Sequence, residues 1–369
     1  SHLQRHINAA VVVNLWRYWQ ATTDLEFMRF WGAEVVLEVA RFWASISTYN
    51  HALDRYEIKG VMGPDEFHEA YPGNDRPGLD NNAYTNVMAV WCLCRAFDVL
   101  EILPGTRRRE LIESLQITDE ELNRWGDISR KMRLCFAQEG ILSQFEGFED
   151  LKELDWDAYR ARYGNIGRLD RILEAEGDSP NAYKLAKQAD TVMLFYLLSS
   201  EELVEIWDRL GYDHDPDFIR RNVEYYEGRT SHGSTLSVMV HSWLHSRLDR
   251  SKSWSLFRSA LESDINDVQG GTTREGIHLA AMTGSVDLLQ RCFAGLELRR
   301  DRLRFNPIWH GSLGELTFAI QYRGLPLEVT VTAGSVKVSA GVGAEQAITI
   351  ECADKTVELV PGALVEFVC

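Results

Sequence analysis

Apolar residues recur at helical spacing over most of this chain, from about residue 6 to residue 297. The first part shows the pattern clearly, because Ile7, Val11, Leu15 and Trp19 lie one helical turn apart. The same spacing continues to Trp43 and predicts further helices over residues 82–101, 107–115, 118–137, 183–199, 201–210, 216–226, 235–249, 252–267 and 277–296. Long helices joined by loops with Gly, Pro and Asn are typical of stacked helical hairpins. Residues 1–297 are therefore predicted to form one mainly helical domain.

After Leu296 the apolar period changes from that of a helix to that of a strand. Apolar and polar residues alternate over 302–305, 316–322, 327–331 and 336–338, and Gly and Pro stand at the breaks. This pattern predicts a small antiparallel β domain over residues 298–369. No Ser-rich or Pro-rich linker separates it from the helical part, so we expect the two domains to pack closely.

The chain is acidic, with a formal net charge of −16 over its 369 residues. Such a surface repels nucleic acid and an anionic membrane, so neither is expected as a partner. No apolar run reaches the roughly 18 residues of a membrane span, and the start does not read as a signal peptide. The six cysteines are widely spread, and we interpret them as free thiols of a cytoplasmic protein. The histidines show no metal-ligand spacing, so no metal site is expected.

The stretch Gly60–Glu69 carries the most suggestive chemistry. Its glycine and proline favour a turn, and the turn presents Glu66 between an acid, an aromatic residue and a histidine. We interpret Glu66 as a carboxyl group held for proton transfer, kept protonated by burial and by the negative charge of Asp65 or Glu69. An acidic loop or a helix cap is the alternative interpretation.

A polar pair, Lys187 and Gln188, starts an otherwise apolar run within Lys184–Leu194. At the start of a helix, these long side chains could donate hydrogen bonds to the hydroxyl groups of a ligand. The alternative is that both are solvated residues of a first helical turn.

The segment Tyr225–Ser237 combines hydroxyl groups, a histidine and two glycines ahead of an apolar helix. Exposed backbone N–H groups and the helix dipole both favour negative charge, so this segment has the features of an anion-binding nest. The side chains concerned are those of Thr230, Ser231, His232 and Ser234. A plain serine or threonine N-cap would have a similar sequence.

The segment Asp267–Leu279 suits inorganic phosphate. Gly270 and Gly271 permit a close backbone approach, and Thr272, Thr273 and His278 add polar side chains before the next helix. Thr272 to Glu275 also matches a capping box, which is the alternative interpretation.

Taken together, the Gly-Pro-Asp-Glu, Lys-Gln-Ala-Asp, Thr-Ser-His and Gly-Gly-Thr-Thr segments resemble, in order and spacing, those of glycoside hydrolase family 65. That family acts on maltose, trehalose, kojibiose and similar disaccharides. The resemblance covers nearly the whole chain and includes Tyr322-Arg323-Gly324 of the β region. It implies part of an (α/α)6 barrel with active-site loops at one end, followed by a small antiparallel β-sandwich.

The resemblance also implies a role for each segment. Glu66 would be the general acid, and Lys187 and Gln188 would hold the glucosyl unit. Phosphate would be held by Thr230, Ser231, His232, Ser234, Gly270, Gly271, Thr272, Thr273 and His278. The implied reaction is inverting phosphorolysis of an α-linked glucobiose to β-glucose 1-phosphate and glucose, with phosphate as co-substrate and no cofactor. Hydrolysis by water and a non-catalytic sugar-binding remnant are the alternatives.

Members of the family are much longer than this chain and carry an N-terminal β-sandwich, a helical linker and the first barrel helices. A partial barrel would expose apolar helix faces, at a cost of roughly 25 cal/mol per Å² left in water. We therefore expect the missing N-terminal half of the enzyme as a partner, either as another chain or as the other piece of a nicked enzyme, with the fragment alone inactive as the alternative. Family precedent also suggests a homodimer.

Overall fold

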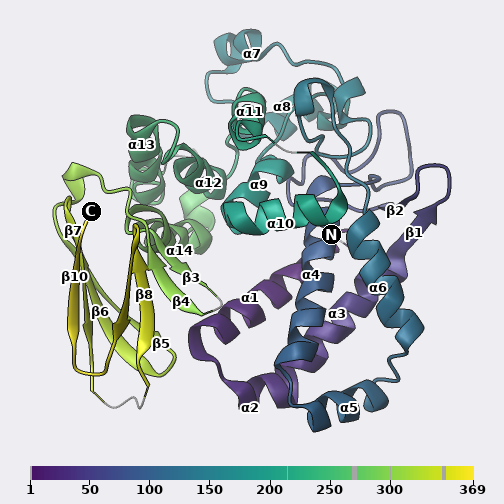
Figure 1. Ribbon diagram of the computed structural model, residues 1–369. Helices are drawn as coiled ribbons and strands as arrows, with labels where there is room; N and C mark the ends of the chain where they lie inside the picture. The colour runs from purple at the N-terminus through teal and green to yellow at the C-terminus, as the bar shows by residue number, and fades with distance from the viewer. Residues whose placement is uncertain (1, 214, 268–271, 300, 343–345) are drawn as a thin grey trace. The chain divides into compact units, whose positions relative to one another are not determined.

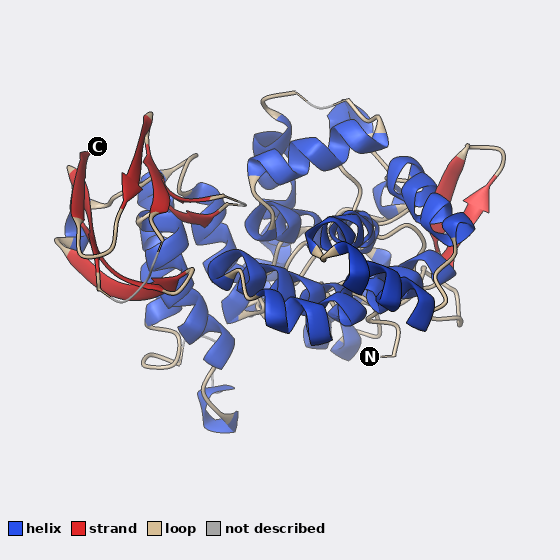
Figure 2. Ribbon diagram, turned by 60° about the horizontal axis from the view of Figure 1, so that its bottom comes forward, coloured by secondary structure: helices blue, strands red, loops and turns tan. Residues whose placement is uncertain are grey.

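The computed structural model describes residues 2–213, 215–267, 272–299, 301–342 and 346–369. Helices dominate as far as residue 293, and strands follow (Figure 1). A short hairpin of β1 (Ser47–Asn50) and β2 (Arg55–Ile58) lies within the helical part (Figure 2). The predicted change from helices to strands is confirmed, and the hairpin is an element that the sequence pattern missed.

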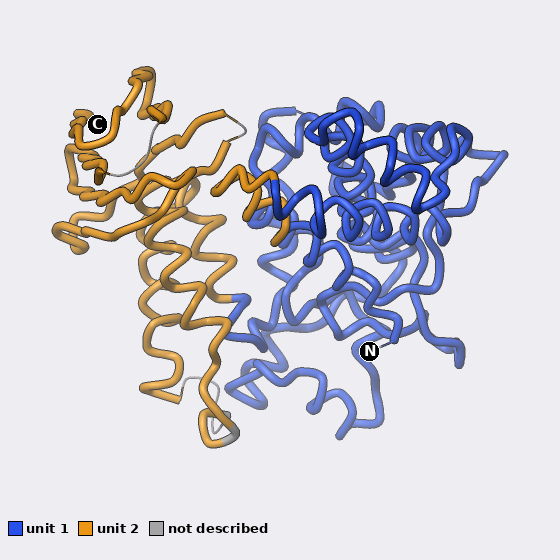
Figure 3. The backbone as a smooth tube through the Cα atoms, turned by 90° about the horizontal axis from the view of Figure 1, so that it is seen from below, with its two compact units in different colours: residues 1–13, 26–237 blue, residues 14–25, 238–369 orange. Residues whose placement is uncertain are grey.

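The chain divides into two compact units (Figure 3). The first consists of residues 1–13 and 26–237, and the second of residues 14–25 and 238–369. The helix α1 (Ile7–Thr22) contributes to both units, as does α12 (Thr235–His245). The boundary predicted at residue 297 falls inside the second unit.

In the first unit, α3 (Ala33–Ile46) packs against the long helix α4 (Ala83–Ile102). The described helices that follow are α5 (Gly105–Ser114), α6 (Asp119–Lys131), α7 (Trp156–Tyr163), α8 (Leu169–Ala175), α9 (Asp190–Leu197), α10 (Ser200–Leu210) and α11 (Phe218–Glu227). The short helix α2 (Leu25–Phe27) and a π-helical turn (Met28–Gly32) precede α3.

The helix α4 forms the centre of this unit because its first eleven residues, from Ala83 to Leu93, are all buried. A helix that is buried on every side must satisfy its polar groups internally. The Asn82 side chain does this at the N-terminus, where it accepts a hydrogen bond from the Thr85 N–H.

The predicted helix over 183–199 is only partly correct. The helix α9 begins at Asp190, and the residues before it run extended, bridging Lys152 to Tyr183 and Ala186 to Thr230. The buried residues of this irregular stretch, Leu185, Ala186 and Ala189, have the spacing of one helical face, which explains the prediction of a helix. The helices α7 and α8 were also missed.

The second unit contains α13 (Arg250–Leu261), the 3-10 turn Thr272–Glu275 and α14 (Leu279–Asp287), which continues as a π-helical turn (Leu288–Phe293). Its strands are β3 (Leu296–Leu298), β4 (Arg302–Phe305), β5 (Leu316–Tyr322), β6 (Leu325–Val331), β7 (Ser335–Ala340), β8 (Ile348–Cys352), β9 (Lys355–Leu359) and β10 (Leu364–Val368).

These strands form two four-stranded sheets, in the orders β10-β7-β6-β5 and β3-β4-β8-β9. Their pairs are antiparallel except that β4 and β8 are parallel, which corrects the prediction of a purely antiparallel domain. A parallel neighbour needs a long connection, and the chain supplies it through β5, β6 and β7. Leu303 and Ile350 of one sheet share a buried cluster with Val329 and Val338 of the other.

Among the described helices, none combines the length and the apolar content that a bilayer crossing requires.

The turn before β3 depends on a glycine. Gly295 has a φ of +67°, and a Cβ there would collide with the backbone of Asn306. We therefore expect Gly295→Ala to lower the free energy of unfolding by roughly 2–4 kcal/mol. Gly324 has a φ of +78° but open space around it, so Gly324→Ala should cost only about 1 kcal/mol. Urea denaturation of the two variants measures the difference, and equal losses would contradict the role of the close contact.

Candidate active site

Glu66 lies in the loop that joins β2 to α4. The base of this loop is closed by a bridge between Val61 and Leu79 and by a hydrogen bond from the Gly60 N–H to the Asp80 carboxylate. Glu66 itself has a φ of +67°, in the left-handed region that non-glycine residues rarely adopt. Such a conformation costs of order 1–3 kcal/mol and persists only where neighbouring structure enforces it. The turn therefore holds Glu66 in a fixed and unusual presentation.

The neighbouring Asp65 points into the protein rather than towards Glu66. Its Oδ1 accepts hydrogen bonds from the backbone N–H groups of Lys187 (2.7 Å) and Gln188 (3.3 Å). Its Oδ2 lies 3.1 Å from both Gln144 Nε2 and His68 Nδ1. Four polar contacts thus compensate the burial of this carboxylate.

His68 braces the turn from the other side. Its Nε2 lies 2.9 Å from the Tyr183 carbonyl oxygen, while its Nδ1 faces the Asp65 carboxylate. Both ring nitrogens therefore face oxygen atoms, and the ring is held at two points. The ring also packs edge-on against Phe145 and Phe148.

A second buried carboxyl, that of Asp190, lies against the same turn. Its Oδ1 accepts from the Asp65 N–H (2.6 Å) and its Oδ2 from Asn82 Nδ2 (2.6 Å). Burial, and secondarily the charge of Asp65, raise the pKa of Asp190 well above its usual range. Sequence reasoning gave Asp190, Asn82 and Gln144 no role. The signal available was an acid at the start of an otherwise apolar helix.

The carboxyl group of Glu66 reaches the surface of the unit. Its side chain is 49% exposed, and its Oε2 lies 2.8 Å from Lys187 Nζ. Its Oε1 lies 3.4 Å from Gln4 Nε2. The sequence analysis expected Glu66 to be buried beside the negative charge of Asp65 or Glu69, and this expectation is wrong. Asp65 is turned inward, Glu69 is exposed, and the closest charge is the Lys187 ammonium.

Lys187 and Gln188 lie ahead of α9, not in its first turn. The backbone N–H groups of both residues are fixed by Asp65, and Gln188 Nε2 donates to the Pro64 carbonyl at 3.2 Å. Within the described part of the chain, the buried Gln188 Oε1 has no hydrogen-bond partner. A buried acceptor without a partner can be satisfied by a bound water or by a ligand that donates a hydrogen bond.

The Thr230–Ser234 segment runs alongside the residues that precede Lys187. The Ala186 N–H donates to the Arg229 carbonyl, and the Ser231 N–H donates to the Ala186 carbonyl, both at 2.8 Å. Across residues 2–213 and the other described ranges, the buried Ser231 Oγ finds no partner. A Cβ at Gly233 would collide with the Gly167 carbonyl oxygen and approach Lys187 Cγ. Ser231 is therefore the available hydroxyl next to the Lys187 segment.

The other polar side chains of this segment have partners within the protein. Thr230 Oγ1 donates to the Tyr226 carbonyl at 2.7 Å, so its proton does not face a ligand. His232 Nδ1 lies 3.1 Å from Ser237 Oγ, and Ser234 Oγ accepts from the Leu236 N–H. The helix α12 begins directly after them, as predicted.

The remaining predicted residues belong to the second unit or lie outside the described residues. Gly270 and Gly271 are outside them, and Thr272 is described only through the backbone of the 3-10 turn. Asp264 fixes the rest of this segment: it accepts from the His278 N–H, lies 2.6 Å from His278 Nδ1 and contacts Thr273 Oγ1 at 3.4 Å. The hydrogen bond from the His278 ring lowers the pKa of the Asp264 carboxyl.

The first unit thus assembles a rigidly presented carboxyl, an ammonium group, an amide oxygen and a hydroxyl within one set of loops. A carboxyl that reaches solvent can deliver a proton, while the unpaired amide and hydroxyl can bind a polyhydroxylated ligand. The two other carboxyls that pack on the Glu66 turn, those of Asp65 and Asp190, are buried and fully engaged. Glu66 is exposed and contacts the Lys187 ammonium group.

Comparison with known families assigns both parts of the chain. Residues 1–287 match the glycosyl hydrolase family 65 central catalytic domain, and residues 296–359 match the family 65 C-terminal domain. These matches follow the same division into helices and strands.

Individual relatives are similar over the whole or most of the chain. An uncharacterized glycosyl hydrolase of Mycobacterium tuberculosis is 52% identical over 369 residues, which are 100% of this chain and 28% of that protein. Trehalose 6-phosphate phosphorylase of Lactococcus lactis is 35% identical over 341 residues, or 92% of this chain and 43% of that enzyme. The chain therefore spans less than half the length of these relatives.

A solved structure supports the fold. The structure of a "putative kojibiose phosphorylase from human microbiome" aligns with a TM-score of 0.75 at 24% sequence identity, covering 98% of this chain and 44% of that one. The family models, the relatives and the fold agree: this chain belongs to glycoside hydrolase family 65.

Proposed function

We propose that this chain forms part of an inverting disaccharide phosphorylase, which cleaves an α-linked glucobiose with inorganic phosphate to β-glucose 1-phosphate and glucose. The observation that carries the proposal is the presentation of Glu66 on a left-handed turn, next to Lys187 and the unpaired polar atoms of Gln188 and Ser231. The name of the Lactococcus relative, a trehalose 6-phosphate phosphorylase, supports the same reaction class.

In this reaction Glu66 donates its proton to the glycosidic oxygen while that oxygen leaves the anomeric carbon. A phosphate oxygen attacks the same carbon from the opposite face, so the new C–O bond forms with inversion. Lys187 and Gln188 hold the glucosyl unit, and the ammonium of Lys187 exchanges its contact with Glu66 for the sugar. The resemblance alone proposes phosphate-binding roles for the 230–235 segment and for the 270–278 segment, which belong to different units.

Phosphate is favoured over water as the attacking group by the state of the two carboxyls that pack beside Glu66, those of Asp65 and Asp190. An inverting hydrolase needs a second carboxylate that activates water. Asp65 and Asp190 are both buried, and each accepts hydrogen bonds through both of its oxygens. Neither carboxyl is free to serve as that base. Phosphate brings its own nucleophilic oxygen and needs no such partner.

We also propose that residues 1–297 form part of an (α/α)6 barrel and that a C-terminal β-sandwich follows. The likeness to the solved structure and the two sheets that share one buried cluster support it. Trehalose-type and kojibiose-type linkages are proposed over maltose. A cytoplasmic location is proposed as well, in line with six free thiols.

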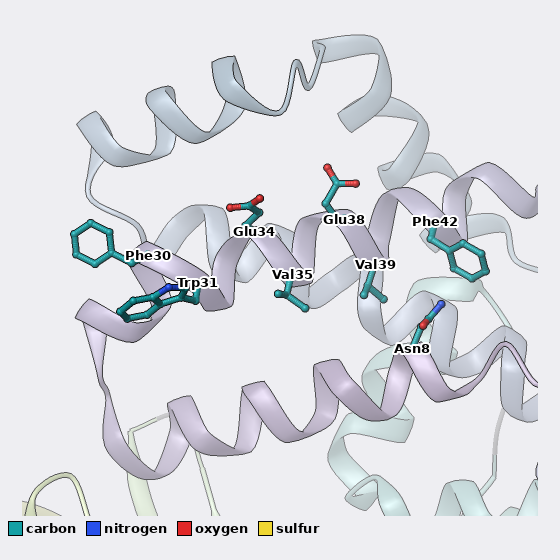
Figure 4. Close-up of a pocket in the computed structure, with 8 residues that line it drawn as sticks. All are labelled: Asn8, Phe30, Trp31, Glu34, Val35, Glu38, Val39 and Phe42. Atoms are coloured by element: carbon teal, nitrogen blue, oxygen red, sulfur yellow. The ribbon is translucent and has the colours of Figure 1, made fainter.

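An apolar patch on α3 and on the π-helical turn before it supports the proposal that the rest of the enzyme packs here. A groove of about 560 Å³ is lined by the residues labelled in Figure 4: Asn8, Phe30, Trp31, Glu34, Val35, Glu38, Val39 and Phe42. Trp31 is 60% exposed and Phe30 50% exposed. Large exposed aromatic side chains in one patch indicate a covered surface in the complete protein. We propose that the missing N-terminal half covers it; a homodimer is the proposed assembly of the whole enzyme.

The requirement for phosphate tests the reaction itself. We expect the complete enzyme to cleave an α-glucobiose only when inorganic phosphate is present, and to release glucose 1-phosphate in equal amount to glucose. Product analysis over a panel of α-glucobioses, each with and without phosphate, measures this. Cleavage at the same rate in phosphate-free buffer would instead establish a hydrolase.

Replacement of Glu66 tests the assignment of the acid. Glu66→Gln keeps the shape of the side chain but removes the proton, so kcat for disaccharide cleavage should fall by roughly 10²–10⁴. Sugar binding, measured by calorimetry, should change little. The matched control is Glu69→Gln, three positions along the same loop and exposed, which should leave kcat within about twofold. Full activity in Glu66→Gln would remove Glu66 from the mechanism.

Truncation of Trp31 tests the covered face. In this chain alone, Trp31→Ala should lower the free energy of unfolding by less than about 1 kcal/mol because the ring is exposed. In the full-length enzyme the same change should cost about 3 kcal/mol, as for a buried tryptophan. The control is Leu53→Ala, in the exposed β1–β2 turn. It should change the free energy of unfolding only slightly in both proteins. Equal effects of Trp31→Ala in the two proteins would show that nothing covers the groove.

A further inference from the structure

The carboxyl of Asp190 touches the turn that carries Glu66 at two points. One oxygen accepts from the Asp65 N–H at 2.6 Å. The other lies where the Cβ of any residue but glycine would stand at position 63. The side chain of Asp190 is itself 1% exposed, at the first position of α9. Two of the three residues that precede Glu66 are therefore packed directly on this one carboxyl.

Asp65 connects the turn to the start of α9 through hydrogen bonds in both directions. Its N–H donates to Asp190, and its own carboxylate accepts from the N–H groups of Lys187 and Gln188, which directly precede α9. The turn at residues 63–66 (the acid turn) therefore both donates hydrogen bonds to residues 187–190 and accepts hydrogen bonds from them. As a result the Glu66 and Lys187 side chains meet at 2.8 Å.

We propose that Asp190 is a positioning residue for Glu66, acting through the backbone of Gly63 and Asp65 without touching the substrate. The proposal rests on the proposed function, in which Glu66 is the general acid. A residue with positive φ returns to the common region when its surroundings no longer enforce the strained conformation. Loss of the Asp190 contacts would let the turn relax and would move the Glu66 carboxyl away from the leaving oxygen. Even a small displacement of a catalytic group lowers the reaction rate strongly.

Asp190→Asn is the informative substitution because it keeps the size of the side chain. The two oxygens of Asp190 face two donors, the Asp65 N–H and Asn82 Nδ2. An amide offers one acceptor oxygen and one NH2 group, so one of these donors must face another donor. Thr191→Val is the matched control: Thr191 is the next residue of α9 and equally buried, but its hydroxyl contacts the Leu142 carbonyl, not the acid turn.

Amide hydrogen exchange of the 61–69 peptide tests the positioning directly and requires no activity. We expect Asp190→Asn to speed exchange in this peptide by about tenfold or more, because residue 190 can then no longer accept from both of its donors. Thr191→Val should leave it unchanged. Exchange that is unaffected in Asp190→Asn would overturn the proposal.

Two substrates separate acid positioning from general damage in the full-length enzyme. A disaccharide needs a proton on its leaving oxygen, whereas α-glucosyl fluoride, assayed with phosphate, has a leaving group that departs without one. Asp190→Asn should lower kcat for the disaccharide by roughly 10- to 100-fold at nearly unchanged KM, and kcat for the fluoride by less than about threefold. Equal losses on both substrates would contradict acid positioning. If the unmodified enzyme cleaves no α-glucobiose, the proposed function fails, and hydrogen exchange still decides the role of Asp190.

Discussion

The candidate site depends on one set of buried hydrogen bonds, in which Asp65 donates to Asp190 and accepts from Lys187 and Gln188. These bonds join segments that lie more than a hundred residues apart along the chain. Two carboxyls buried side by side are unfavourable unless every oxygen is satisfied. Here each oxygen has its donor, and the pKa of Asp190 is raised by its burial. The arrangement fixes both the backbone of the acid turn and the start of α9.

The chemistry of the site follows from this constraint. Because Asp65 and Asp190 are turned inward, Glu66 is left as the outward carboxyl of its turn, with an ammonium group as its neighbour. The unpaired atoms of Gln188 and Ser231 lie in the same and the adjoining segment. A buried polar atom without a partner is costly in a finished structure. A sugar or a phosphate that supplies the missing hydrogen bonds would remove that cost.

The sequence anticipated elements that carry strong local signals. The helix α10 begins with Ser199 and Glu202, which form a capping box, and ends at Gly211 in the left-handed conformation. Such signals operate within a few residues and can be read without the rest of the fold. The extended stretch before α9 has no such signal, because its conformation is set by hydrogen bonds to Asp65 and to the Arg229–Ser231 strand-like segment. The β1–β2 hairpin was missed because each strand has only four residues.

By itself the sequence determined that helices precede strands, that the four polar segments carry the candidate chemistry, and that their pattern is that of family 65. It named Glu66, Lys187, Gln188 and Ser231 as candidate site residues, and the structure places all four in one unit. Only the tertiary structure decided which acid faces outward, that Thr230 is already engaged, and that Asp190 lies against the acid turn. The physical reason is distance along the chain. The period of apolar residues along the chain shows which face of an element is buried. It does not show which residue a buried polar group will contact, because that partner can lie far away in the sequence, as Asp65 and Asp190 do at a separation of 125 residues.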